Sequence, residues 1–335
     1  MKDAFDVVTP AGPVTIEPLQ HLQRYWHDAG STLKWDCLFM LPPWLAVWWS
    51  HFGEIPKTHL YVVRQRDVLL GLAPLVVSGD TVYLINDVDI IDYSDFIVAP
   101  SREREFFLGL FDHLRREGIG RLDVGRIRED STVLSCLRTY STSLGCHVSS
   151  EPVDVLYEMD LPKTWEEYLD LLSGKERHET RRKLRRLESA GHVKLRIIED
   201  ETDVSVAMDT FMALFRSNRA EKATFMTATV ESFFRSLAVG MASAGLLKLF
   251  FLDVNDIPAA VAMCFDYNST IYLYNNGYHR RFSHLSVGLL NTVFSIRESI
   301  MLGRKKYSFL RGSERYKDRL AGHPVKLHHC EVILK

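Results

Sequence analysis

The sequence has little net charge and no clustered cysteines, and both absences narrow the range of functions. The formal net charge is −2 over 335 residues, which argues against a protein that coats nucleic acid but allows a local basic patch. No two cysteines are close enough in sequence to suggest a zinc site, and their odd number indicates reduced thiols. Two of them fall in predicted strands, where we interpret them as small core residues, namely Cys264 and Cys330.

No stretch is long and apolar enough to predict a membrane span. The most apolar run, residues 38–49, is interrupted by Pro42 and Pro43 and is too short to cross a bilayer. The first six residues are too acidic for a signal peptide, so a cytoplasmic protein is expected, with peripheral membrane contact left open. The C-terminal histidines do not share a metal-binding spacing, so no metal is expected; they are His323, His328 and His329.

The length and the order of predicted elements indicate two domains. A hydrophobic content of 46% and a charged content of 25% are typical of a soluble globular protein. Each half reads as strand, helices, three-strand meander, helix, strand, helix and strand, although no repeat of individual residues is evident. The pattern predicts an α/β fold with mixed sheets, in an N-terminal domain of residues 1–160, an arginine-rich helical linker of 161–191 and a C-terminal domain of 192–335.

The stretch from Ile271 to Leu320 carries the most distinctive pattern. A β-rich segment, 271–275, leads into a polar, basic loop, 276–288, and then into an apolar helix that Gly303 terminates. A basic loop before a helix suits an anion, because the N–H groups of the first turn and the helix dipole favour negative charge. The loop is therefore predicted to hold a diphosphate through Arg280, Arg281, Ser283, His284, Ser286 and Gly288.

A second basic feature is the arginine run of residues 175–187. Helical spacing brings several of its arginines onto neighbouring positions. One interpretation is that Arg181, Arg182 and Arg185 face a cleft between the domains and hold an anionic substrate, either a sugar phosphate or an RNA backbone. The other is that they form a solvated helix face.

These motifs resemble those of the GNAT acyltransferases. The tandem arrangement is similar to the Fem-type aminoacyl transferases, and more closely to the CelD-like bacterial acetyltransferases associated with polysaccharide loci. The matching stretches, in chain order, are 39–52, 69–74, 92–95, 177–187, 276–288 and 309–319. The sequence departs from the GNAT pattern Gln/Arg-x-x-Gly-x-Gly/Ala, because Arg281-Phe-Ser-His-Leu-Ser286 has no glycine before Gly288.

The resemblance implies two tandem GNAT-like domains and an acyl transfer. The donor would be acetyl-CoA or another acyl-CoA, and the acceptor an amine or hydroxyl of a small or sugar-linked molecule. The resemblance connects such a reaction with polysaccharide or envelope synthesis. A Fem-type transfer from aminoacyl-tRNA is one alternative, and a non-catalytic binding module is another.

Acyl transfer needs a proton donor for the leaving group and a base for the nucleophile. The resemblance gives the first role to Tyr316, which could otherwise only pack at the sheet edge. Glu314 or Asp95 could be the base, or else an ion-pair partner of an arginine. The predicted substrate-binding set, beyond the arginine run, is Arg219, Lys222, Asn276 and Lys317.

Overall fold

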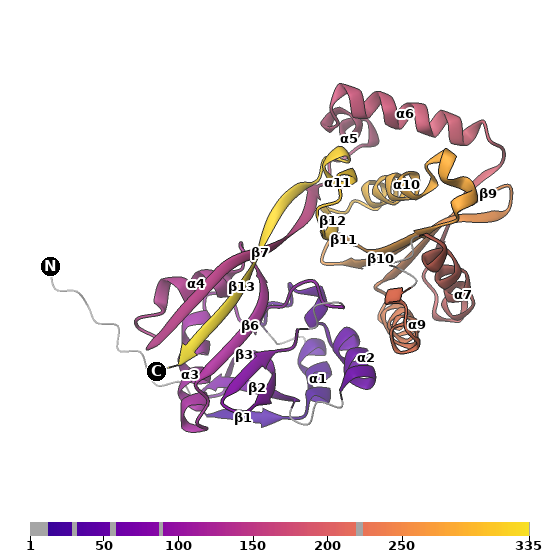
Figure 1. The fold of residues 1–335 in the computed structure, drawn as a ribbon. Coiled ribbons are helices and arrows are strands. Elements are labelled where there is room, and N and C mark those ends of the chain that lie inside the picture. The colour runs from indigo at the N-terminus through magenta and orange to yellow at the C-terminus, as the bar shows by residue number, and fades with distance from the viewer. Residues whose placement is uncertain (1–12, 29–31, 54–57, 87–89, 219–223, 335) are drawn as a thin grey trace. The chain divides into compact units, whose positions relative to one another are not determined.

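The computed structural model describes residues 13–28, 32–53, 58–86, 90–218 and 224–334. The chain divides into two compact units (Figure 1), one made of residues 1–154 and 326–335 and the other of residues 155–325. Within the described residues, no helix is long and apolar enough to cross a membrane.

The first unit is a mixed sheet with helices packed on it. Its core joins the inward side chains of the strands to the apolar side of α3 (Glu103–Arg116) and α4 (Thr132–Tyr140). The strands are β1 (Val14–Glu17), β2 (Thr58–Gln65), β3 (Val68–Ser78), β4 (Thr81–Leu84), β5 (Ile97–Val98), β6 (Arg121–Arg128) and the larger parts of β7 (Cys146–Asp160) and β13 (His323–Leu334). The helices are η1 (Leu19–His21), α1 (Leu22–His27), η2 (Leu38–Met40), α2 (Pro42–Phe52), α3 (Glu103–Arg116) and α4 (Thr132–Tyr140).

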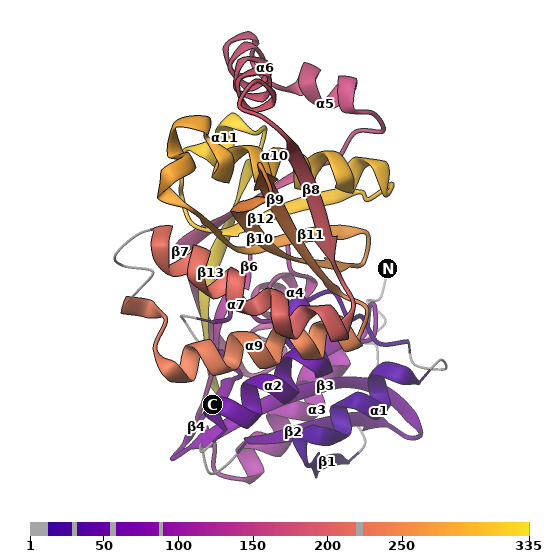
Figure 2. The same cartoon turned by 90° about the vertical axis from the view of Figure 1, so that its right-hand side faces the viewer.

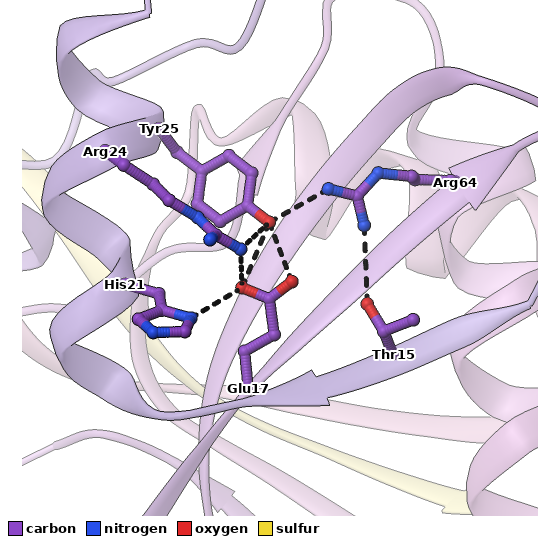
Figure 3. Close-up of polar contacts among 6 residues, drawn as sticks. All are labelled: Thr15, Glu17, His21, Arg24, Tyr25 and Arg64. Carbon is purple, nitrogen blue, oxygen red and sulfur yellow. Dashed lines mark hydrogen bonds and ion pairs between the residues drawn. The ribbon is translucent and has the colours of Figure 1, made fainter.

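A polar network fixes the first helix of this unit to the sheet (Figure 3). The hydroxyl of Tyr25 donates to Glu17 at 2.9 Å and accepts from Arg64 of β2 at 2.9 Å, while Arg24 donates to Glu17 at 2.6 Å. Burial of the Glu17 carboxyl raises its pKa, but the hydrogen bond from Tyr25 and the charge of Arg24 outweigh this and lower the pKa. The network therefore ties α1, β1 and β2 together.

The second unit is a mixed sheet covered on both faces (Figures 1 and 2). Helix α10 lies on one face, and α7 and α9 lie on the other. The strands are β8 (Val193–Ile198), β9 (Leu247–Val254), β10 (Ile257–Tyr267), β11 (Thr270–Tyr278) and β12 (Lys306–Arg311). The helices are α5 (Trp165–Leu171), α6 (Gly174–Glu188), α7 (Glu201–Asn218), α9 (Ala228–Ser243), η3 (Arg280–Leu285), α10 (Val287–Met301) and α11 (Tyr316–Arg319).

The two units repeat each other in residue-level detail, which the sequence reading did not detect. Adding 189 to the residue numbers of β2 and β3 gives those of β9 and β10. The next strand then begins Thr81-Val-Tyr-Leu-Ile-Asn86 in one unit and Thr270-Ile-Tyr-Leu-Tyr-Asn275 in the other, with the same offset. Three parallel pairs follow in both: residues 81–83 with 121–123, and residues 270–272 with 306–308.

The irregularities of the sheets repeat as well. The second strand of each parallel pair, β6 or β12, has a bulge two residues beyond the last pair. The bulge residues are Gly125 with φ of 67° and Leu310 with φ of 56°. Each bulge N–H donates to the side chain two residues earlier, Asp123 at 2.8 Å and Ser308 at 3.3 Å. Each bulge lies in the pairing with an antiparallel neighbour, β13 in the first unit and β7 in the second, so the two units share this irregularity as well.

The structure divides the chain differently from the sequence prediction at two places. The C-terminal part of β13 pairs with β6, so residues 326–335 belong to the first unit and not to the second. Helices α5 and α6 are part of the second unit instead of a separate linker, because Leu187 packs into the same core as Phe282 and Leu290.

Candidate active site

The second unit opens between β11 and β12. These strands pair only as far as Tyr272 and Ser308, although β11 continues to Tyr278 and β12 to Arg311. A bulge at Tyr274 also shifts the pairing of β11 with β10. The edges of both strands beyond the last pair therefore face a gap at which backbone groups can meet a ligand.

Tyr316 and Asn276 meet at this gap. Tyr316 is the first residue of α11, its ring packs edge-on against Phe309 at 6.3 Å between centroids, and its hydroxyl is hydrogen-bonded to the side chain of Asn276 on β11. Burial raises the pKa of Tyr316, and the nearby charge of Glu314 raises it further. The phenol is therefore protonated at neutral pH and can act as a proton donor.

Lys317 anchors the turn that carries Tyr316. Its side chain is 2% exposed, and its ammonium donates to the carbonyls of Leu310 (3.1 Å), Arg311 (2.6 Å) and Gly312 (3.0 Å). It also pairs with the half-exposed Glu314 at 3.0 Å. The geometry thus gives Lys317, predicted to bind substrate, a positioning role at the end of β12, because its three N–H groups point at protein acceptors.

The first unit closes the equivalent gap. There, Ser94 donates its backbone N–H to Arg126 of β6 at 2.8 Å and its hydroxyl to Ile85, just after β4, at 2.7 Å. By the repeat described above, Arg126 corresponds to Arg311, whose carbonyl is held by Lys317 in the second unit. Ser94 is fully buried, and its two hydrogen bonds connect β6 to the segment after β4. In the described part of the second unit, β11 and β12 are not connected at the equivalent position.

The predicted anion loop forms η3 and the start of α10. The apolar side chains of Phe282 and Leu285 are buried, which the three-residue period of a 3-10 helix allows. The polar side chains of Arg280, Arg281, Ser283 and His284 are therefore left on the exposed side. His279 caps η3 by accepting from the Arg281 N–H at 3.1 Å.

The N-terminus of α10 is bounded by Ser286 and an arginine that the sequence reading did not select. Ser286 is in the left-handed region with φ of 59° and makes no side-chain hydrogen bond to the first turn. Arg186 of α6 donates to the Ser286 hydroxyl at 3.2 Å. Gly288 contributes by its lack of a side chain, since a Cβ there would lie 2.8 Å from the ring of Tyr278.

Helix α6 separates the three predicted arginines. Arg182 is held by Glu179 through two bonds of 2.8 Å, and the hydrogen bonds from Arg182 lower the pKa of Glu179 to about 2. Arg181 and Arg185 are exposed on another side of the helix, where they line a groove of about 800 Å³. In the part of the chain that the structure describes, neither of these two guanidinium groups has a hydrogen-bond or ion-pair partner.

Asp95 lies in the first unit beside the start of α4. Its carboxylate accepts from the Ser131 hydroxyl at 2.7 Å and from the Phe96 N–H at 2.8 Å. Burial raises its pKa to about 7, against the lowering effect of these hydrogen bonds. Of the other predicted residues, Arg219 and Lys222 lie outside the described residues. Among those that are described, no group of three metal-ligating side chains occurs.

Comparisons with known proteins agree with this fold. The family model for an acetyltransferase (GNAT) domain matches residues 174–318, which lie within the second unit. No curated protein sequence matches the chain.

Three solved structures are similar over most of the chain. FemX is 13% identical with a TM-score of 0.65, covering 97% of this chain and 98% of its own. A conserved protein of unknown function from Bacteroides thetaiotaomicron is 12% identical with a TM-score of 0.58, covering 96% and 99%. The C-terminal domain of a lysylphosphatidylglycerol synthetase described as putative, from Agrobacterium fabrum, is 11% identical with a TM-score of 0.54, covering 79% and 81%. At these identities the likeness shows the fold.

The chain therefore has a mixed α/β fold of two tandem GNAT-like units, and residues 174–318 of the second unit match the model of the acetyltransferase (GNAT) domain family. The prediction of a GNAT-type fold is confirmed, whereas membership of the CelD-like group stays a prediction.

Proposed function

We propose that the protein is an acyltransferase whose second unit binds an acyl-pantetheine thioester, as in acetyl-CoA, in the gap between β11 and β12. The observation that carries this proposal is the contrast between the units. In both units the parallel pairing ends after three pairs. In the first unit Ser94 bridges the strands beyond that point by two hydrogen bonds, whereas in the second unit the strands stay apart beside Tyr316 and Asn276.

The residues around the gap fit such a donor. Backbone groups of β11 beyond its last pair with β12 can hydrogen-bond the amides of a pantetheine chain, as a strand added to the sheet would, whereas Lys317 already holds the carbonyls of Leu310 and Arg311 on β12. The uncapped first turn of α10 and the guanidinium of Arg186 suit the pyrophosphate. Arg280, Arg281, Ser283 and His284 offer further contacts from the exposed side of η3.

The chemistry then requires one proton to be removed and one to be supplied. An amine or hydroxyl of the acceptor attacks the thioester carbonyl, the bond between carbon and sulfur breaks, and the thiolate leaves. Tyr316 supplies the proton that converts the thiolate to a thiol. The charge of the Glu314 carboxylate acts on Tyr316, so we assign to Glu314 the proton that the acceptor loses.

Transfer from aminoacyl-tRNA is the second candidate function, and the full-length similarity to FemX favours considering it. The groove on α6 with its exposed Arg181 and Arg185 would then contact the RNA backbone. The acceptor under either function is a small or saccharide-linked amine or hydroxyl.

Tyr316→Phe tests the first proposal. The variant keeps the ring that packs on Phe309 and removes the hydroxyl, with its acidic proton and its hydrogen bond to Asn276. Transfer from acetyl-CoA should slow by roughly 100-fold or more with donor affinity nearly unchanged. Tyr83→Phe, at a 41% exposed side chain in the first unit, is the matched control and should transfer at the wild-type rate. If Tyr316→Phe also retains the wild-type rate, Tyr316 is a packing residue and the mechanism is wrong.

A further inference from the structure

The groove on α6 is the strongest charged feature that the proposed mechanism leaves unused. Helix α6 holds seven lysines and arginines against three glutamates, in a chain whose net charge is −2. The groove of about 800 Å³ is lined by Gly174, Arg177, His178, Arg181, Leu184, Arg185 and Glu188. Steps of three residues separate the adjacent pairs and single positions of this set, so its members share one side of the helix.

This side differs from the side that faces the proposed donor phosphates. Arg186, which reaches Ser286 at the N-terminus of α10, does not line the groove. Arg182 is held by Glu179 and does not line it either. The groove therefore presents Arg181 and Arg185 for a contact of their own, separate from the seat of the pyrophosphate.

The helix nevertheless lies along the donor gap. Near its start, Glu176 approaches Arg319 of α11 at 3.9 Å, and α11 carries Tyr316. Ten residues later, roughly 15 Å along the axis, Arg186 contacts the cap of α10. A macromolecule bound to the groove would lie on the side of α6 opposite Glu176 and Arg186, so an arm that it carries would reach the gap by passing around the helix, which is about 10–12 Å wide.

The lining of the groove selects the chemistry of that macromolecule. Leu184 offers an apolar contact between Arg181 and Arg185, and Glu188 ends the row with a negative charge. Single-stranded nucleic acid is usually held by aromatic platforms as well as basic side chains, and the groove has no Phe, Tyr or Trp. An apolar contact flanked by arginines instead complements an acidic amphipathic helix, which binds with its apolar residues in a groove and its carboxylates at the rim.

We propose that the α6 groove docks an acidic helix of a carrier protein that delivers the acyl group on a phosphopantetheine arm. This inference rests on the proposed function, because it names the source of the same thioester. The carrier supplies the pantetheine thioester that CoA also supplies, and its acidic helix replaces the contacts that the adenosine part of CoA would make. From a carrier docked on α6, the arm would pass around the helix to the gap between β11 and β12.

The test measures binding of a purified bacterial acyl carrier protein, in its apo form without the arm, to the full chain by fluorescence anisotropy. We expect saturable binding at low ionic strength that weakens as salt is added. The double variant Arg181→Glu, Arg185→Glu should weaken binding by at least about 10-fold, because two attractive contacts become repulsive. The double variant Lys175→Glu, Lys305→Glu is the control, since it changes the net charge equally at exposed positions outside the groove.

Three outcomes overturn the proposal. The carrier protein does not bind, or both double variants lose affinity for it equally. In the third outcome, tRNA binds instead of the carrier protein, and the Arg181→Glu, Arg185→Glu variant abolishes that tRNA binding. Thermal protection of the wild type by acetyl-CoA is measured alongside. Protection without carrier binding leaves the acyltransferase standing and removes the docking surface. The absence of protection by either donor form, acetyl-CoA or the acetylated carrier, refutes the proposed function itself.

Discussion

Replacing Lys317 by methionine should show whether this residue positions Tyr316 at the gap or binds the substrate. Methionine keeps most of the apolar length of the side chain but removes the ammonium. The carbonyls of Leu310, Arg311 and Gly312 then lose the donor that holds them together at the end of β12. Tyr316 is the adjacent residue, so its position depends on this anchor.

The magnitude follows from the number of bonds and their surroundings. A hydrogen bond to a charged group contributes about 1.5–3 kcal/mol, and three of them set an upper limit near 9 kcal/mol. Two effects reduce this value. The buried ammonium itself costs several kcal/mol to desolvate, and Glu314 is 53% exposed, so its ion pair with Lys317 adds little. We therefore expect a loss of about 2–4 kcal/mol in the free energy of unfolding of the second unit.

The assay combines scanning calorimetry with hydrogen exchange of residues 306–320. Lys317→Met should lower the transition of the second unit by roughly 4–16 °C, at about 2–4 °C for each kcal/mol, and should speed exchange at β12. Transfer should fall with it, since the Tyr316 hydroxyl loses its fixed place. Lys305→Met, at an exposed side chain one residue before β12, is the control and should change neither. A fully stable Lys317→Met variant with unchanged exchange but no transfer would refute the positioning role and return Lys317 to the substrate-binding residues.

Two further predictions concern the first unit, and tryptophan fluorescence can follow both, because five of the six tryptophans lie there. The pKa of Asp95 is raised to about 7, against about 3.8 in the unfolded chain, so the folded state binds the proton more tightly. The stability that the protonated Asp95 contributes is therefore complete below pH 4 and is lost as the pH rises to 7. Asp95→Asn should remove that slope, and an unchanged slope would show that another group causes it. Tyr25→Phe should destabilise the unit by about 1–2 kcal/mol, because Glu17 loses a donor and Arg64 an acceptor. Tyr140→Phe, at a 42% exposed side chain, is the control and should not destabilise it. Equal unfolding midpoints for the two variants would contradict the role of the network.

Much of the fold could be predicted from local patterns. Strands such as β3 and β10 alternate or run apolar between turn residues, and their neighbours are joined by tight turns, so element order was readable along the chain. The repeat was not recognised, because burial requires only apolar character at most of its positions. Val62 and Phe251 occupy equivalent core positions with different side chains.

The site was harder to predict than the fold, because its residues act through contacts far apart in sequence. Arg186 looks like any other member of a basic run until the fold brings it to Ser286, 100 residues later. Lys317 reads as a surface cation next to the tyrosine that we propose as the proton donor, and only the turn of the backbone after the Leu310 bulge shows that Lys317 is buried. The split of Arg181 and Arg185 from Arg182 depends on the position of Glu179, which helical spacing could have suggested.

The repeat finally predicts how many donors one chain can bind. Two copies of the same opening could hold two acyl-CoA molecules, but Ser94 bonds to both sides of the opening in the first unit. Inserting a pantetheine chain there would break two buried hydrogen bonds and leave carbonyls of β6 and of the segment after β4 without donors, which costs about 1–3 kcal/mol for each. Titration calorimetry should therefore find one acetyl-CoA for each chain. The Arg186→Ala variant should weaken that single site, whereas Ser94→Ala should leave its affinity unchanged. Two sites of similar affinity would show that the hydrogen bonds of Ser94 do not exclude the donor from the first unit. The contrast between the units would then no longer support the choice of the second unit as the catalytic one.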